Sequence, residues 1–323
     1  MAEAPGWLRT ASVPLMLGAG ALVAIQARAN GGLADRLGGG TRAGALAAVI
    51  SFGSGLVILS VVVLLRPSAR RGVTDLVAAL RQRRLRPFEL LGGLGGAFFV
   101  ASQGIAVGTI GIALFIVAFT AGQSASSLLV DHLGWSPHGR HQIAPARVVA
   151  ALLAVVAVIL TAGERLVRDA DVLLVAFAVL AFVAGTLQAV QQALNGRVAA
   201  VGGPWPSTWN NFVVGTAGLL VFFAVTSLKG DDLEPLPHTW WVYLGGVCGI
   251  GFIWVGSWTV RLHGVLVLGL CMIAGQVVTA EIMDLAGDDG HVGVVGVLGG
   301  VTTLVGVAIA LWSRRSGTPA TAP

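Results

Sequence analysis

Carboxamide side chains recur at matched positions in a sequence that is otherwise strongly apolar. Gln26 and Asn30 stand four residues apart, and Gln191 and Asn195 repeat that spacing 165 residues later. Residues four apart share one face of a helix. An amide offers both N–H donors and a carbonyl acceptor, so it can bind a polar solute, although amides also bond neighbouring membrane helices to each other. Both interpretations stay open for each amide, and the matched set favours a polar cavity.

A second pair of amides lies in a longer repeated pattern. Ala-Gly-Gln ends at Gln123 and again at Gln276, and an aspartate follows eight residues later in each case, at Asp131 and Asp284. Two such copies facing each other would enclose a transporter site between them. Asn30 and Asn195 could equally cap the ends of their own helices. The expected substrate-binding amides are Gln26, Asn30, Gln123, Gln191, Asn195 and Gln276.

Trp254 and Glu281 are two further candidates, each with an alternative. Trp254 could line the cavity and face a cation or an aromatic solute, or it could belong to the interfacial belt of tryptophans. Glu281 is the acid that we assign to a membrane span, so it is a candidate for proton coupling. Because it stands three residues before Asp284, it could instead lie among the lipid headgroups.

Helices that cross a membrane must position these side chains. Of the 323 residues, 55% are hydrophobic and 11% are charged, and the mean hydropathy is +0.85. Ten apolar runs are each long enough to cross a bilayer core of about 30 Å. The sequence therefore predicts an all-α integral membrane protein. The expected spans are 12–29, 43–65, 88–108, 110–130, 146–163, 171–194, 208–228, 239–259, 264–283 and 291–312.

The repeat divides these spans into two units. An offset of 153 residues relates the two Gln–Asp patterns, and it also maps Gly92-Gly93 onto Gly245-Gly246. We expect one five-helix repeat over residues 1–163 and another over 164–323. Because each contains an odd number of spans, the two should be inverted relative to each other.

The basic residues are distributed unequally between the two sides of the membrane. If the amino terminus is cytoplasmic, 14 of the 20 basic residues fall inside and six outside, whereas four acids fall inside and ten outside. This bias predicts that both termini are cytoplasmic, in agreement with an even number of spans. We therefore attribute the net charge of +5 to the orientation of the chain in the membrane, and no nucleic-acid partner is expected.

Several other features have simpler explanations. The segment 66–87 carries apolar residues at helical spacing among arginines, which predicts an amphipathic helix on the inner membrane face. Cys248 and Cys271 fall inside spans and are expected to be packing residues. His138 and His141 lack nearby ligands, so no metal site is expected. Without a phosphate-binding loop or a nucleophile–base pair, neither a cofactor nor enzyme activity is expected.

The stretch from Gly122-Gln123 through Asp131 to Gly134-Trp135, followed by Arg147, resembles the YdcZ-like family of the drug/metabolite transporter superfamily. Gln26 to Asn30 and Ser51-Phe52 resemble that family's opening segment, and its members commonly have five spans. The resemblance implies two such units fused into a ten-helix, EamA-like carrier of the bacterial inner membrane that moves small metabolites or drugs outward. The second half matches less well, which suggests specialised halves.

The sequence thus predicts a secondary active transporter, an exporter of a small polar metabolite or drug that works by alternating access. The expected partners are a small-molecule substrate and the lipid bilayer, with a homodimer left open. The alternative is a non-transporting membrane subunit or sensor that binds a lipid or a protein, and it would depend on segment 66–87 more than on the amides.

Overall fold

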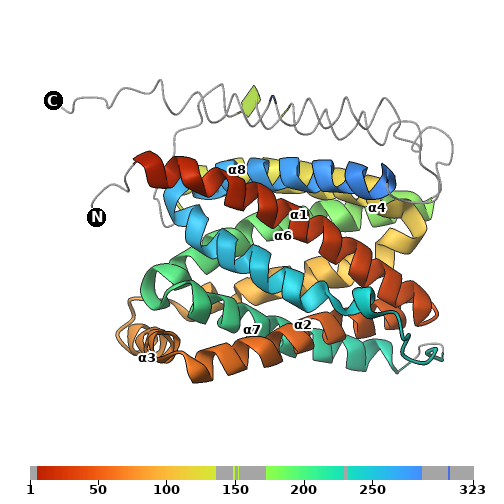
Figure 1. Ribbon diagram of the computed structural model, residues 1–323, viewed down its shortest axis with the longest axis horizontal. Helices are drawn as coiled ribbons and strands as arrows, with labels where there is room; N and C mark the ends of the chain where they lie inside the picture. The colour runs from red at the N-terminus through yellow and green to blue at the C-terminus, as the bar shows by residue number, and fades with distance from the viewer. Residues whose placement is uncertain are drawn as a thin grey trace.

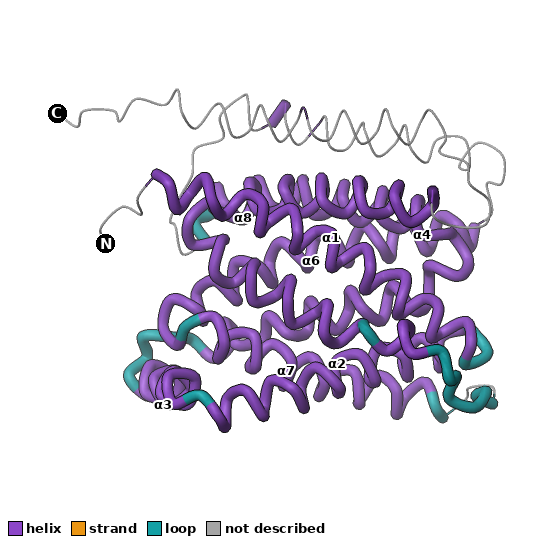
Figure 2. Tube along the Cα trace, in the orientation of Figure 1, coloured by secondary structure: helices purple, strands orange, loops and turns teal. Residues whose placement is uncertain are grey.

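The structure is a computed structural model in which residues 6–135, 148–149, 152, 172–228, 232–285 and 305 are described. Within these ranges every regular element is a helix (Figure 2), as expected of a backbone that must satisfy its own hydrogen bonds in lipid. The elements are α1 (Gly6–Arg36), α2 (Gly40–Leu65), α3 (Pro67–Arg81), η1 (Pro87–Leu91), α4 (Gly92–His132), α6 (Val172–Gly202), α7 (Pro204–Thr226), η2 (Trp240–Tyr243) and α8 (Gly245–Leu285).

Six helical stretches of the described chain are long and apolar enough to cross a membrane, judged by length and composition alone. They are Ala11–Arg36, Gly40–Leu65, Pro87–Ile110, Val175–Gly202, Pro204–Thr226 and Trp240–Ala280. The ten expected spans are therefore found only in part. The expected runs 146–163 and 291–312 lie almost wholly outside the described residues.

α4 and α8 each hold two of the expected runs. Both contain 41 residues, and at 1.5 Å per residue a straight helix of that length would be about 60 Å long, twice the thickness of a bilayer core. In α8 the helical geometry is interrupted at Gly264, whose φ of 79° and ψ of 173° are accessible mainly to glycine. The chain changes direction there (Figure 1), between the expected eighth and ninth spans.

The helices pack in pairs that join the two halves of the sequence. α1 lies along α8, and α4 lies along α6, in the two most extensive helix contacts of the described structure (Figure 1). Glycines allow both contacts: a Cβ on Gly20 would overlap the backbone of Met272, and a Cβ on Gly185 would overlap that of Phe119. Small residues of this kind let membrane helices approach each other closely.

α2 and α7 form the third pair, and their contact is nearly symmetric. Phe52 of α2 and Phe212 of α7 stack with their ring centroids 4.7 Å apart. Gly55 lies beneath the Phe212 ring, and Gly215 lies beneath the Phe52 ring, so that neither position could accept a Cβ. The two helices run in opposite directions, since α2 ends next to α3 whereas α7 begins at that end (Figure 1).

α3 confirms that the segment 66–87 contains an amphipathic helix, but its buried face packs on protein. Ala69, Gly72, Leu76 and Ala79 are buried. A Cβ on Gly72 would overlap the carbonyl oxygen of Gly202, which shows how closely α3 approaches the end of α6. The smallest side chains of the helix therefore face the bundle.

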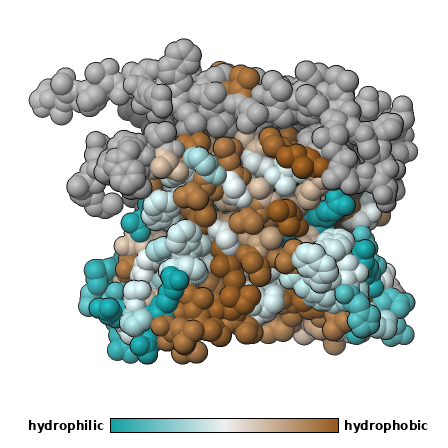
Figure 3. Space-filling model, in the orientation of Figure 1, coloured by the Kyte–Doolittle hydropathy of each residue, from teal (hydrophilic) through white to brown (hydrophobic). Residues whose placement is uncertain are grey.

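The surface shows how the bundle is oriented. On the face shown in Figure 3, apolar side chains fill the middle and hydrophilic ones gather toward the two ends. One end carries α3 with its arginines and the opposite end carries Arg36, Asp232 and Glu234. This distribution is that expected for a bundle that crosses a membrane along the direction joining those ends.

Candidate functional site

The first predicted amide pair joins α1 to the start of α8 and to Gln103 of α4. Gln26 and Asn30 are both buried. Gln26 Nε2 donates to the carbonyl oxygen of Gly245 at 3.0 Å, and Asn30 Nδ2 donates to Oε1 of Gln103 in α4 at 3.0 Å. The side-chain nitrogens of this pair are therefore bonded to two different helices.

The second predicted pair is bonded differently, to a single residue of α7. Gln191 Nε2 and Asn195 Nδ2 both donate to Oδ1 of Asn211, at 3.0 and 2.9 Å. In addition, Ser207 Oγ donates to the backbone oxygen of Asn195 at 2.7 Å. One amide oxygen thus accepts from two buried amides of the same helix face.

Glycines place each pair against the opposite half of the sequence. A Cβ on Gly96 would lie 2.8 Å from Gln191 Nε2, and a Cβ on Gly249 would lie 2.9 Å from Gln26 Nε2. Gly92 of the first half likewise approaches Oδ1 of Asn195 in the second half, and Gly245 of the second half approaches Oδ1 of Asn30 in the first. The amides of each half therefore contact the glycine-rich helix of the other, and four of the predicted residues lie where the halves meet.

A small cavity lies between α6 and α8. Its volume is about 10 Å³, which is room for the centre of one water-sized group. Four amides of α6 form one wall, and α8 supplies the other. The lining residues are Gln188, Gln191, Gln192, Asn195, Phe252, Ile253, Gly256, Ser257 and Met272.

Five residues that line the cavity each have a side-chain oxygen with no hydrogen-bond partner within the described structure. Unpaired polar atoms are costly in a membrane interior, so a buried group of them indicates a place for a ligand or a water. The atoms are Gln188 Oε1, Gln191 Oε1, Gln192 Oε1, Asn195 Oδ1 and Ser257 Oγ.

Gln123 and Gln276 are buried but do not line this cavity. Gln123 lies in the second part of α4, where a Cβ on Gly269 would be 3.6 Å from its Nε2. Among the described residues neither Nε2 nor Oε1 of Gln123 has a partner, and the same holds for Nε2 of Gln276. The structure therefore separates these two glutamines from the Gln191–Asn195 cavity that the sequence grouped them with.

Trp254 lies in an aromatic group outside the cavity lining. Its ring centroid is 5.5 Å from that of Trp205 and 6.4 Å from that of Trp258. The Arg66 guanidinium lies over the Trp205 ring at 5.0 Å. This group lies toward the end of the bundle that carries α3. Glu281 falls in α8, but its side chain lies outside the described residues.

Two residues outside the predicted substrate-binding set complete the amide clusters. Gln103 is wholly buried and pairs with Asn30, yet Gly256 stands at the position 153 residues later, so the repeat gave no signal for it. Asn211 is the shared acceptor of the second cluster, and its position beside Phe212 in the matched Ser51-Phe52 pattern was the available signal.

Asp131 has a structural role at the break in α8. Its carboxylate accepts from the backbone N–H groups of Val265 and Leu266 at 3.0 and 3.2 Å, immediately after Gly264. An acidic side chain at free helix amides is stabilised both by the hydrogen bonds and by the helix dipole. The aspartate of the first half therefore caps a helix segment of the second.

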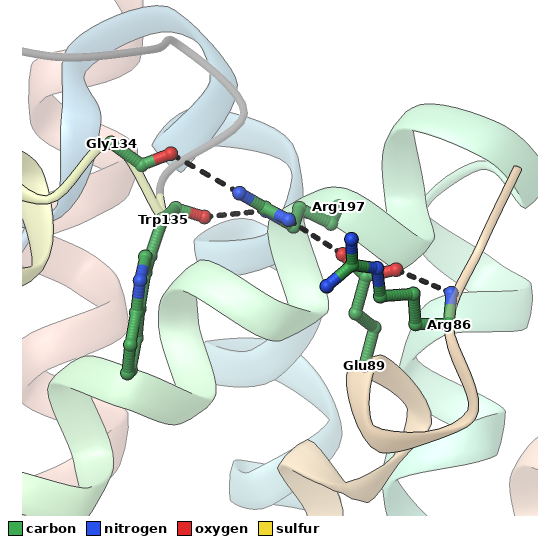
Figure 4. A network of polar contacts seen from close by, with 5 residues as sticks. All are labelled: Arg86, Glu89, Gly134, Trp135 and Arg197. Atoms are coloured by element: carbon green, nitrogen blue, oxygen red, sulfur yellow. Dashed lines mark hydrogen bonds and ion pairs between the residues drawn. The ribbon is translucent and has the colours of Figure 1, made fainter.

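Polar contacts join the halves again at the α3 end (Figure 4). Arg197 of α6 forms an ion pair with Glu89 of η1 at 2.6 Å, and Glu89 accepts from the backbone N–H of Arg86 at 2.7 Å. The same guanidinium donates to the carbonyl oxygens of Trp135 and Gly134 at 2.7 and 3.1 Å. One arginine thus holds the end of α6 to both ends of α4.

Comparison with known proteins agrees with this architecture. A structure described as “Crystal structure of protein” has a TM-score of 0.67 over 96% of this chain and 99% of its own, at 17% sequence identity. At that identity the likeness concerns the fold alone. Among curated proteins, no relative matches the chain significantly.

The sequence itself matches one protein family twice. Residues 12–160 and 176–311 match the family described as “Putative inner membrane exporter, YdcZ”. The two matched regions confirm the resemblance predicted from the sequence and cover most of both halves. The chain therefore belongs to the YdcZ family of the drug/metabolite transporter superfamily, a family of inner-membrane exporters.

Proposed function

We propose that this protein is a secondary active transporter that exports a small polar solute by alternating access between two inverted five-helix halves, residues 1–163 and 164–323. The observation that carries the proposal is the amide-lined cavity between α6 and α8. A buried group of polar atoms without partners is unfavourable in a membrane unless a ligand completes it. Gln191 and Asn195 of the predicted set contact the solute in this proposal.

Contacts between helices of opposite halves support the inverted arrangement. α1 lies along α8 as α4 lies along α6, and α2 and α7 contact each other through equivalent phenylalanines and glycines. Inverted repeats of this kind place the binding site at their interface, near the middle of the membrane. Gln26 and Asn30 hold the reciprocal interface in the first half.

The two ends of the bundle supply the gates. At the α3 end the Arg197–Glu89 ion pair joins the halves. At the other end Arg36 lies over the Trp241 ring at 5.1 Å, and a Cβ on Gly32 would meet the same ring at 2.7 Å. In this proposal the contacts at the two ends close the route on both sides, as an occluded state requires. Opening one end at a time is what alternating access requires.

The orientation belongs to the same proposal. The arginine-rich α3 end faces the cytoplasm, with both termini on that side, because basic residues concentrate at cytoplasmic ends. Single cysteines at Arg81 and at Asp232, in a chain with Cys248 and Cys271 replaced by alanine, test it in intact cells. A membrane-impermeant thiol reagent should label position 232 and not position 81. Labelling of both positions, or of 81 alone, would contradict the orientation.

Gln123, Gln276 and Glu281 keep the roles that the sequence assigned, as parts of a route next to the cavity. Gln123 has both polar side-chain atoms buried and without partners among the described residues, which supports a solute-binding or water-binding role for it. Glu281 would couple transport to protons. Trp254 would act from the aromatic group at the cytoplasmic end of the route.

The function is tested by transport from proteoliposomes loaded with a mixture of polar metabolites, with release measured by mass spectrometry. The wild-type protein should release at least one solute faster than empty vesicles do. Gln191→Leu and Gln123→Ala should abolish that release at normal reconstitution levels. Thr259→Val is the matched control, because Thr259 is buried in α8 and its hydroxyl donates to the backbone of its own helix at Val255. No release of any solute, or unchanged release by both amide variants, would contradict the proposal.

A further inference from the structure

Three amides that line the cavity between α6 and α8 share one polarity, because their nitrogens are hydrogen-bonded and their oxygens are not. The side-chain nitrogens of Gln191 and Asn195 both point to Asn211. Nε2 of Gln192 donates to the sulfur of Met272 at 3.4 Å. A thioether sulfur carries no hydrogen, so only the nitrogen end of Gln192 can pair with it. The oxygens of these three amides are therefore left without a partner among the described residues.

Five side-chain oxygens without partners in the described structure belong to residues that line a space for one water-sized group. They come from Gln188, Gln191, Gln192, Asn195 and Ser257, all of which are more than nine-tenths buried. Phe252 also lines the space and offers an aromatic ring. No carboxylate is among the lining residues. A set of neutral oxygens beside a ring suits a positively charged group, because oxygens can replace its hydration shell and the ring face attracts it.

We propose that this cavity binds one small monovalent cationic group, an ammonium or an alkali cation, through the free oxygens of Gln188, Gln191, Gln192, Asn195 and Ser257. The inference rests on the proposed transport function and names the chemistry of its site. Such a group has two sources: the ammonium head of the exported solute, or a free ion that drives transport. Both need the same acceptors, whereas the lone pairs of a carboxylate or phosphate group would be repelled by those of the amide oxygens.

The first half of the chain shows which side chains can replace the cavity's glutamines. At the positions 165 residues earlier, Gln188 and Gln192 correspond to Val23 and Ala27. The variant Gln188→Val with Gln192→Ala therefore uses side chains that the chain already places beside its other glycine-rich helix. It removes two of the five free oxygens. Ser257→Ala removes a third oxygen with almost no change in shape.

Binding is measured on the purified full-length protein in nanodiscs, by calorimetry and by the unfolding temperature. Chlorides of sodium, potassium, ammonium and methylammonium are compared with choline chloride at constant ionic strength. At least one small cation should bind saturably and raise the unfolding temperature above its value in choline, whose trimethylated head is too large. Loss of one charged hydrogen bond corresponds to about tenfold weaker binding, so Ser257→Ala should weaken binding roughly tenfold. Thr259→Val should bind as the wild type does.

The results distinguish the two sources of the cationic group, and they distinguish this inference from the proposed transport function. Binding of ammonium and methylammonium without the metal ions assigns the site to a solute head group, and binding of sodium or potassium assigns it to a driving ion. If no small cation binds better than choline, the cavity holds a buried water only and the inference is wrong. Unchanged binding by Ser257→Ala, or preferential stabilisation by acetate or phosphate, would also overturn it. Release of a neutral solute from proteoliposomes with no cation binding would retain the transport function and reject this site chemistry.

Discussion

The two halves of the protein use the same amide pair on α1 and α6 but surround it differently. In the first half Gln103 reaches Asn30 and fills the space beside it, and Val23 and Ala27 line the helix face. In the second half the position that matches Gln103 is occupied by Gly256, which lines the cavity between α6 and α8.

In the second half the matched asparagine has its hydrogen-bond partner on a different helix. Asn211 of α7 bonds Asn195, whereas the smaller Ser51 stands at the matched position of α2. The comparison shows that one half is closed by its own glutamine and the other is left open. A duplicated fold can thus keep the symmetry of its packing while it confines the binding chemistry to one side.

The strongest test of this comparison is to close the open half. Gly256→Gln places the side chain of Gln103 at the matched position of α8, where a Cβ has only Leu268 Cδ2 within contact distance, at 3.8 Å. The glutamine should fill the cavity and reduce transport by roughly tenfold or more, since each loss of about 1.4 kcal/mol in binding is a factor of ten. Solute release from proteoliposomes measures it.

Gly256→Ala is the graded control for that variant. It adds only the Cβ, so transport should fall less than with glutamine. If Gly256→Gln reconstitutes normally and transports at the wild-type rate, the cavity is not on the transport route.

The second test removes the shared acceptor of the open half. Asn211→Ser copies the residue of the first half and leaves the amide nitrogens of Gln191 and Asn195 without their acceptor. Each buried donor left unpaired costs about 1–3 kcal/mol, so the free energy of unfolding should fall by at least about 2 kcal/mol. Denaturant titration in detergent micelles measures the change.

Ser51→Ala is the counterpart control in the first half. The Ser51 hydroxyl is buried and has no partner among the described residues, so its removal should change stability little. Equal losses for Asn211→Ser and Ser51→Ala would show that the two halves do not differ in this way.

The third test concerns the α3 end, where an ion pair joins the halves. Glu89→Gln keeps the shape of the side chain but removes its charge opposite Arg197. The Arg197 side chain is 34% exposed, so solvent screens the pair and the expected loss of stability is about 1 kcal/mol. The shift in unfolding midpoint should be smaller in high salt. Salt-independent destabilisation would indicate that packing, and not charge, joins this end.

The smallest effect is expected at the opposite end. Arg36→Met keeps the aliphatic part of the side chain and removes the guanidinium from the Trp241 ring. An exposed cation–π contact contributes about 0.5–1 kcal/mol, so the unfolding midpoint should move only slightly. A loss larger than that of Glu89→Gln would reverse the order of the two ends.

Much of the fold followed from the sequence. Apolar runs predicted membrane helices, and the 153-residue offset matched α4 to α8, whose described bounds differ by that same number. The match was possible because glycine and amide positions repeat with the helices that carry them. The expected boundary between 88–108 and 110–130 falls inside the one helix α4, whose first part, Pro87–Ile110, is a candidate span by itself.

The sequence by itself determined that the chain crosses a membrane, that it repeats, and that Gln191 and Asn195 share a polar face. These properties depend on hydrophobicity and on residue spacing along one helix, both of which are local. Only the tertiary structure decided that Gln103 fills one half while Gly256 leaves the other open, and that Gln123 lies apart from the cavity. Those facts depend on which helices of the two halves meet, and a side chain's partner across an interface leaves no periodic trace in the sequence.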